Sequence, residues 1–219
     1  MPMNSDSPPL ALTILVHGLW QSGLELFVMR RRLQADGSMR AIFFSYPTVV
    51  GSMSNHVRRL IECARAHQTE RLHFVGHSLG GLVVLRALEV TDDLPPGRAV
   101  LLGSPLQGSR TAQSLARIPI VRTLLGGALT EECVNWSPRE WSGRREVGVI
   151  AGSMGYGVGR LFANLDEAHD GTVLVEETRL PGAKDHIVVN ATHTGLLVSA
   201  EVAEQTRHFL ENGAFSRAL

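Results

Sequence analysis

Short apolar runs alternate with longer segments of helical period along most of this chain. Largely apolar stretches of strand length occupy residues 10–16, 40–46, 71–75 and 99–102. Helices are expected at residues 24–35, 53–67 and 79–90, and in the second of these Val57, Leu60, Ile61 and Ala64 share one face. Further strands are expected at 146–151 and 184–189, and a closing helix at 201–210. The alternation predicts an α/β fold, with a mostly parallel central sheet flanked by helices.

The alternation stops between residues 104 and 145. This stretch contains three prolines, a Gly-Gly pair and two tryptophans. A connection of this length inside a compact domain is usually functional or carries small helices of its own. We therefore expect a cap insertion at about residues 105–145, with a helical excursion that never contacts substrate as the alternative.

Composition narrows the class of protein. The 219 residues are enough for one domain, taken here as 1–219, and leave little room for a second. Lys and Arg together number 21, as do Asp and Glu. The balanced charge offers no field for nucleic acid or anionic membranes, so neither is an expected partner. The oligomeric state is left open.

Cysteine content and hydropathy address redox chemistry and location. Only Cys63 and Cys133 are present, and neither has metal-ligand spacing, so no disulfide framework or zinc site is expected. Residues 1–9 do not have the pattern of a signal peptide, and no apolar run is long enough to span a membrane. A cytoplasmic location without stable membrane insertion is the expectation.

The strongest chemical signal is the sequence Gly76-His77-Ser78-Leu79-Gly80-Gly81. A serine hydroxyl is a weak nucleophile that needs an exposed, fixed position and a neighbouring base. A sharp turn between a strand and a helix supplies that position, and a predicted strand and helix flank this motif. Side chains two residues before and after would crowd the turn, so glycine is needed there. The motif predicts Ser78 as a nucleophile.

A second signal, His17-Gly18-Leu19-Trp20, follows the first predicted strand. Attack on an ester places negative charge on the carbonyl oxygen, and backbone N–H donors must already point at it. Leu79, at the start of a helix, supplies one donor. The loop after the first strand is the natural source of the other.

Together these motifs resemble those of α/β-hydrolase fold esterases and lipases, over nearly the full chain. Gly103-Ser104-Pro105, Asp170-Gly171-Thr172-Val173 and His193 contribute to the resemblance, which is greatest to bacterial lipases whose oxyanion loop reads HGL. It implies that the N–H groups of Leu19 and Leu79 form the oxyanion hole. The HGGG loop of another esterase branch is missing.

His193 is the expected base among nine histidines. It falls between an apolar strand and the final helix, and active groups gather beyond the carboxyl ends of strands. His186 is the main alternative, although it precedes the same strand. His208 lies within the last helix, His77 is expected to point elsewhere, and His17 is expected to order the oxyanion loop.

Asp170 is the expected acid that orients the imidazole. Its Asp-Gly pair also has the ordinary explanation of a tight turn, and the resemblance to a DGTV motif favours the catalytic role. Asp166 and Glu167 are alternatives in the same loop, and Asp185 is assigned to the last strand. The nearby Gly155-Tyr156-Gly157-Val158-Gly159 has the wrong spacing for a nucleotide-binding loop.

These residues predict a serine carboxylic-ester hydrolase of esterase or lipase type, with an acyl-enzyme on Ser78 and no metal or other cofactor. The substrate is expected to be a small-molecule ester or a lipid. Apolar residues near the site could line a substrate wall or form the core of the cap: Trp20, Leu124, Leu125, Trp136 and Trp141. A thioesterase or amidase, a catalytically silent binding module and a cofactor-free haloperoxidase-like activity are the alternatives.

Overall fold

A six-stranded parallel sheet forms the centre of the computed structural model, which describes residues 11–155 and 167–217. The strand order is β2-β1-β3-β4-β5-β6, and every neighbouring pair is parallel. The strands are β1 (Ala11–Val16), β2 (Met39–Phe44), β3 (Leu72–His77), β4 (Ala99–Leu102), β5 (Val147–Gly152) and β6 (Asp185–Val189). The predicted α/β fold with a mostly parallel sheet is confirmed.

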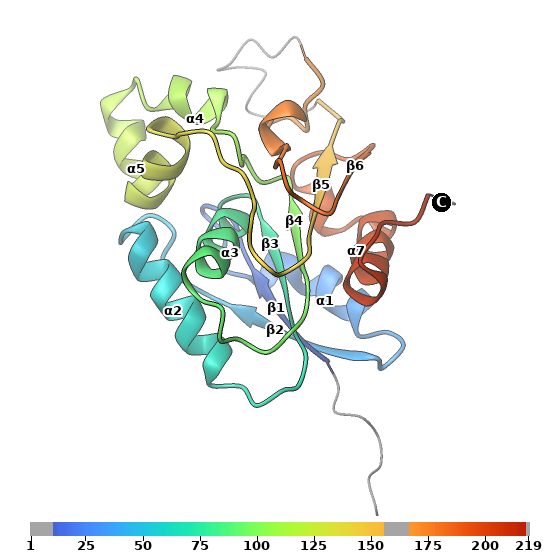
Figure 1. The fold of residues 1–219 in the computed structure, drawn as a ribbon. Helices are drawn as coiled ribbons and strands as arrows, with labels where there is room; N and C mark the ends of the chain where they lie inside the picture. The colour runs from blue at the N-terminus through green and yellow to red at the C-terminus, as the bar shows by residue number, and fades with distance from the viewer. Residues whose placement is uncertain (1–10, 156–166, 218–219) are drawn as a thin grey trace, which may run out of the picture.

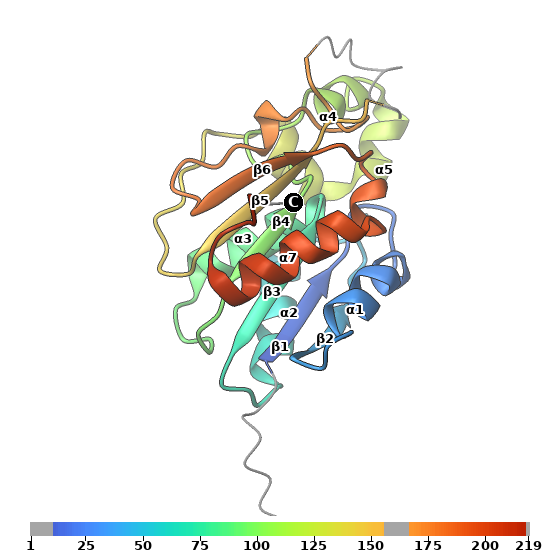
Figure 2. The ribbon, with the colours of Figure 1, turned by 90° about the vertical axis from the view of Figure 1, so that its right-hand side faces the viewer.

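Helices cover both faces of the sheet (Figures 1 and 2). On one face lie α2 (Met53–Arg65) and α3 (Leu79–Val90), and on the other lie α1 (Phe27–Leu33) and α7 (Ala200–Asn212). The serine caps predict where two of them begin, since Ser52 Oγ accepts from the N–H of Asn55 and Ser199 Oγ from that of Val202. Burial of apolar side chains on both faces explains why the central strands are nearly continuous apolar runs.

The direction of the chain reverses at β1. From β1 the chain moves outward to β2, then returns to place β3 on the other side of β1. Loops leaving the carboxyl ends of β1 and β3 therefore diverge, which opens a crevice at this point of an α/β sheet. In the paired register Val16 lies opposite Gly76, so the His17-Gly18-Leu19 loop and Ser78 emerge side by side.

Residues between β4 and β5 form helical segments above the carboxyl edge of the sheet (Figure 1). They are α4 (Arg110–Leu115), α5 (Pro119–Leu129) and a π-helical turn, η2 (Thr130–Val134). Within α5, Gly126 has φ 77° and ψ 164°, which breaks the helix there. The small helices are present where the sequence pattern breaks down, and their role as a cap over substrate stays a prediction.

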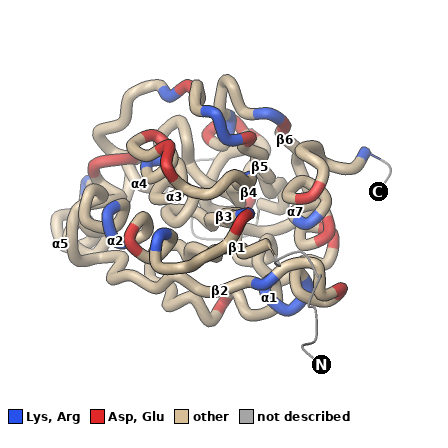
Figure 3. The backbone as a smooth tube through the Cα atoms, turned by 60° about the horizontal axis from the view of Figure 1, so that its bottom comes forward, with Lys and Arg blue, Asp and Glu red and all other residues tan. Residues whose placement is uncertain are grey.

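Charged residues of both signs are mixed along the outer segments (Figure 3), in keeping with the balanced composition. Across residues 11–155 and 167–217, no helix is long and apolar enough to cross a membrane. Three short 3-10 turns complete the description: η1 (Leu24–Leu26), η3 (Glu176–Thr178) and η4 (Gly195–Leu197).

Candidate active site

Ser78 occupies a strained turn between β3 and α3. Its backbone has φ 53° and ψ −121°, a region that residues with a side chain rarely adopt. A Cβ on Gly76 would lie 2.6 Å from the Cα of Gly81, and one on Gly80 would collide with the carbonyl oxygen of Val16. Only glycine permits these close approaches, which explains the spacing of the motif. The turn holds the Ser78 side chain at the switch point of the sheet.

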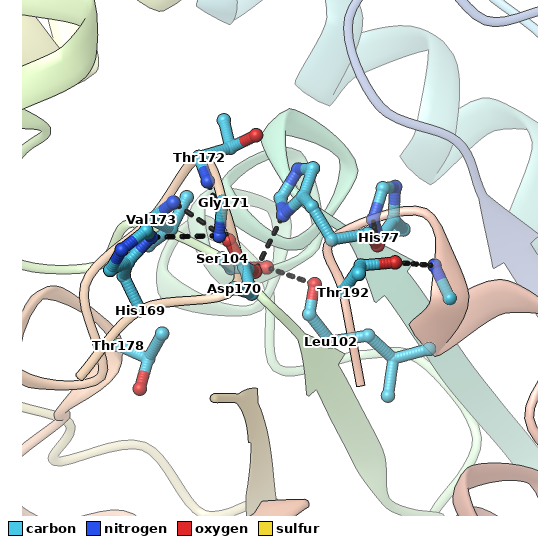
Figure 4. Close-up of polar contacts among 12 residues, drawn as sticks. His77, Leu102, Ser104, His169, Asp170, Gly171, Thr172, Val173, Thr178 and Thr192 are labelled. Carbon is cyan, nitrogen blue, oxygen red and sulfur yellow. Dashed lines mark hydrogen bonds and ion pairs between the residues drawn. The ribbon is translucent and has the colours of Figure 1, made fainter. Parts of the chain in front are cut away.

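Asp170 and His193 form a hydrogen-bonded pair. Asp170, in the long loop after β5, is buried, and its Oδ2 lies 2.7 Å from Nδ1 of His193, just after β6. Its other oxygen, Oδ1, accepts from the N–H groups of Thr172 at 2.9 Å and Val173 at 2.8 Å (Figure 4). Since both carboxylate oxygens have donors, the buried charge is compensated. The acid holds the imidazole at Nδ1, and His193 lines the cavity described below.

Gly103, after β4, makes room for this pair. It has φ 54°, and a Cβ there would lie 3.0 Å from Asp170 Oδ2 and 3.2 Å from His193 Nδ1. The nearby Asp-Gly turn is real as well, because Gly171 also has a positive φ of 98°. Asp170 therefore begins a tight turn and also contacts His193, so the two interpretations of this residue are compatible.

A tight turn carries the candidate oxyanion donor of Leu19. The N–H of Gln21 donates to the carbonyl of Gly18 at 3.4 Å, which closes the turn. Trp20 within it has φ 58°, and its N–H donates to Thr48 Oγ1 at 3.1 Å. Among the hydrogen bonds of the described residues, the N–H of Leu19 donates to none. Leu79 opens α3, where the first N–H groups of a helix lack intrahelical partners.

His17 supports this turn through contacts with Gly18 and Tyr46. Its Nδ1 lies 3.0 Å from the carbonyl oxygen of Gly18, and its Nε2 accepts from the N–H of Tyr46 at 3.3 Å. The Tyr46 hydroxyl donates to the carbonyl of His17 at 2.9 Å, and the two rings stack. Burial lowers the pKa of His17. A neutral ring protonated at Nδ1 satisfies both contacts, which suits a structural role.

A cavity of about 240 Å³ joins these groups. Ser78, His193, Leu19 and Trp20 line it together with apolar residues of the segment between β4 and β5: Ala112, Leu115, Leu125 and Leu129. No hydrogen bond joins Ser78 to His193 among those of the described residues. Such bonds are often long before substrate binds. The cavity combines an apolar wall with the candidate nucleophile Ser78, and such a lining suits an apolar ligand.

Of the five residues predicted to line a substrate wall or to form the core of the cap, Trp141, Trp136 and Leu124 do not line this cavity. Trp141 is buried in the core, where its indole N–H donates to the carbonyl of Arg145 at 2.9 Å. Trp136 packs against Gly108. The side chain of Leu124 is 52% exposed and does not line the cavity. The reason is that α5 turns Leu125 inward, so its sequence neighbour faces outward.

Of the alternatives for base and acid, His186, Asp185 and Glu167 do not line the cavity. His186, at the start of β6, has its Nε2 2.9 Å from Thr178 Oγ1. Asp185 Oδ2 accepts from the N–H of Phe215 at 2.9 Å, and Glu167 pairs with Arg110. Asp166 and residues 156–159 of the glycine-rich loop lie outside the described residues.

Sequence reasoning missed the contacts of Gln21 and underrated those of His77. Gln21 Oε1 accepts from the N–H of Gly18 at 2.8 Å, and His77 Nε2 lies 3.0 Å from the carbonyl oxygen of His193. No motif marks Gln21, since its partners come from separate loops. The position of His77 beside the serine was the only available signal.

A comparison with protein families identifies the family of this chain. The profile of the alpha/beta hydrolase family matches residues 13–185, and the chain belongs to that family. No curated protein matches the sequence.

Solved structures show the same fold. The mature lipase BlEst2 of Bacillus licheniformis superposes with a TM-score of 0.69 at 19% identity, covering 90% of each chain. The carboxylesterase CesB of Bacillus subtilis has a TM-score of 0.60 at 15% identity, covering 94% of this chain and 86% of its own. The NocB thioesterase domain of the nocardicin cluster has a TM-score of 0.61 at 16% identity, covering 94% and 96%. The family and these neighbours support a hydrolase.

Proposed function

We propose that this protein is a serine hydrolase that cleaves carboxylic esters through an acyl-enzyme on Ser78. The observation that carries the proposal is one constellation. A serine held at a positive φ lines the same cavity as a histidine, and that histidine is bonded at 2.7 Å to a buried aspartate. Structural roles alone give no reason for a strained serine beside an oriented imidazole.

The geometry suits a two-step acyl transfer. His193 Nε2 takes the proton of Ser78 as Oγ attacks the acyl carbon, and the N–H groups of Leu19 and Leu79 hold the oxyanion. The alcohol leaves with the proton that His193 returns. Water then loses a proton to His193 and attacks the acyl-enzyme, which releases the acid and restores the serine. Asp170 stabilises the imidazolium that forms in each step.

The cavity favours a small apolar acyl group. Its apolar wall comes from Ala112, Leu115, Leu125 and Leu129, and none of the described residues that line it is Asp, Glu, Lys or Arg. An ester with a short to medium acyl chain therefore suits the site better than a charged one. We take a small-molecule ester or lipid as the substrate and a cytoplasmic location as the working hypothesis.

A thioesterase is the second candidate. The same three residues would attack a thioester, and the NocB thioesterase domain shares the fold over nearly its whole length. An amide substrate would use the same groups with a poorer leaving group.

Labelling with a fluorophosphonate probe tests the nucleophile. The wild type is expected to react at Ser78, and Ser78→Ala is expected to remain unlabelled. Ser38→Ala, at an exposed position, serves as the matched control. An unlabelled wild type would favour a silent binding module instead.

A panel of p-nitrophenyl esters of rising chain length, beside thioester and amide analogues, tests the reaction class. We expect the highest kcat/KM for short to medium acyl esters. A higher value for the matched thioester would favour the second candidate. Halogenation without hydrolysis would favour a haloperoxidase-like activity.

A further inference from the structure

His77 is a buried imidazole that the proposed reaction does not use. It ends β3, directly before Ser78, and its side chain is 1% exposed. An apolar side chain would be buried there without losing hydration, whereas a polar ring costs free energy unless it is hydrogen-bonded. The contacts of His77 therefore indicate what the ring does.

One ring nitrogen of His77 reaches the loop that carries the candidate base. Its Nε2 lies 3.0 Å from the carbonyl oxygen of His193, and the two ring centroids are 4.6 Å apart. Because a carbonyl only accepts, Nε2 must carry the proton. The N–H of His193 donates to the carbonyl of Asp170 at 2.8 Å. Both backbone groups of His193 are thus hydrogen-bonded, the carbonyl to His77 and the N–H to Asp170.

The other ring nitrogen faces the oxyanion turn. His77 Nδ1 lies 3.3 Å from Gln21 Oε1, the oxygen that accepts from the N–H of Gly18. The N–H of Gly18 fixes the orientation of the Gln21 side-chain amide, because a reversed amide would place its NH2 group against that N–H. Gln21 therefore packs between the Gly18 backbone and the imidazole.

The protonation state of His77 follows from its surroundings. Only a doubly protonated ring could donate to both oxygens. Burial, and next the neighbouring His193, hold the pKa of His77 well below its usual value. The ring is therefore neutral and protonated at Nε2. Its Nδ1 then carries a lone pair, so the contact with Gln21 Oε1 at 3.3 Å is not a hydrogen bond. A neutral ring does not repel the imidazolium that His193 forms during turnover.

We propose that His77 and Gln21 are positioning residues: His77 ties the nucleophile turn to the His193 loop, and Gln21 separately holds the oxyanion turn. This inference rests on the proposed function, in which all three segments act on one substrate. His77 anchors the carbonyl of His193, and Gln21 anchors the N–H of Gly18 beside Leu19. Together they set where the imidazole and the oxyanion donor stand relative to Ser78.

Replacing His77 tests the anchor on His193. His77→Phe keeps the ring shape and removes the donor, and we expect kcat to fall about 10- to 100-fold while KM changes less than about threefold. His77→Gln, whose amide can donate to the same carbonyl, is expected to recover much of kcat. A kcat for His77→Phe within about twofold of wild type, or no recovery with Gln, would overturn the proposal.

His73→Phe is the matched control. His73 is a buried histidine in the same strand, and its Nδ1 accepts from the N–H of Arg98 at 3.0 Å. We expect it to lower the free energy of unfolding and leave kcat unchanged. An equal loss of kcat in both variants would mean that general destabilisation explains the effect and would overturn the positioning role.

A double-variant cycle tests whether the two anchors act separately. Gln21→Leu removes the acceptor for the N–H of Gly18 and is expected to lower kcat on its own, and its loss is expected to multiply with that of His77→Phe. A Gln21→Leu kcat within about twofold of wild type would overturn the Gln21 anchor, and a departure from multiplication by about fivefold or more would show a direct His77–Gln21 bond and overturn the tautomer.

Nitrogen-15 NMR of the wild type gives a readout without turnover. We expect His77 to remain neutral, with its proton on Nε2, from pH 5 to 8. A proton on Nδ1, or titration in this range, would overturn the assignment of the donor. If the wild type cleaves no ester, the proposed function fails while this spectrum still decides the His77 contact.

Discussion

The carboxyl edge of the sheet and the segment at residues 105–145 are held in different ways. At the edge, close backbone approaches and hydrogen bonds between loops position Ser78, Asp170 and His193. The segment between β4 and β5 packs apolar side chains, among them Leu125 and Leu129, into the same hydrophobic core as α2 and α3. Within it, Glu132 is buried between Arg139 of the same segment and Arg86 of α3. The edge is thus held by close backbone approaches and hydrogen bonds, and the segment above it by a shared apolar core and a buried ion cluster.

Trp20 connects the two regions. It sits in the oxyanion turn, and its indole N–H donates to the carbonyl of Leu124 in α5 at 3.0 Å. Its positive φ costs about 1–2 kcal/mol for a residue with a side chain, and these hydrogen bonds offset that cost. The comparison teaches that the proposed catalytic edge and the segment that supplies the apolar wall meet through Trp20.

The largest expected effect comes from the acid at the edge. Asp170→Asn would place an amide donor against Nδ1 of His193 and favour the wrong tautomer, so we expect kcat to fall by about 10³–10⁴ with the fold intact. Asp185→Asn is the control outside the cavity. Steady-state kinetics and circular dichroism measure both. A larger loss from Asp166→Asn would move the acid to that residue.

The buried charge of the segment above the edge comes next. The Glu132 and Arg139 side chains are 3% and 7% exposed, so Glu132→Gln leaves the buried Arg139 guanidinium without its counter-charge, whereas Arg86 keeps its pair with Glu89. We expect the free energy of unfolding to fall by about 3 kcal/mol. Urea denaturation measures it, with Glu131→Gln as the exposed neighbour for comparison. Equal stability in the two variants would show that the segment does not depend on this cluster.

We expect low pH to destabilise the protein through residues outside the segment at 105–145, because all nine histidines lie there. Burial lowers the pKa values of His17 and His77, and that of His73 to about 4. Below pH 6.5 these histidines become protonated in the unfolded chain but stay neutral in the folded protein. The free energy of unfolding therefore falls as the pH drops from 6.5 towards 4.

The slope of this acid effect can be measured. We expect up to about 1.4 kcal/mol per pH unit for each fully buried histidine. Urea midpoints between pH 7 and 4.5 test it, and His73→Phe should show a shallower decline. An unchanged slope in that variant would exclude His73 as a contributor.

The smallest effect is expected where the two regions meet. Trp20→Phe keeps an aromatic ring at the cavity and removes the bond to Leu124, so we expect kcat/KM to fall about 2- to 10-fold. Trp136→Phe, which lies outside the cavity, should leave kcat/KM unchanged. The reverse result would restore Trp136 to the substrate wall and undo its reassignment.

Local sequence patterns determined most of the elements. The strand–turn–helix around Ser78, the serine caps at Ser52 and Ser199 and the apolar runs of the sheet each depend on neighbours close in sequence. Periodicity and glycine spacing report such contacts directly. The six strands were therefore predicted with ends within two residues of those observed.

Tertiary structure alone decided which distant residues meet. The bond from His77 to the carbonyl of His193 spans 116 positions, and that from Trp20 to Leu124 spans 104. The inward turn of Leu125 and the burial of Trp141 likewise follow from how α5 and the core pack. Side chains far apart in sequence come together through strand order and helix packing. The periodicity of a single sequence does not reveal which strands are neighbours or which helices pack together.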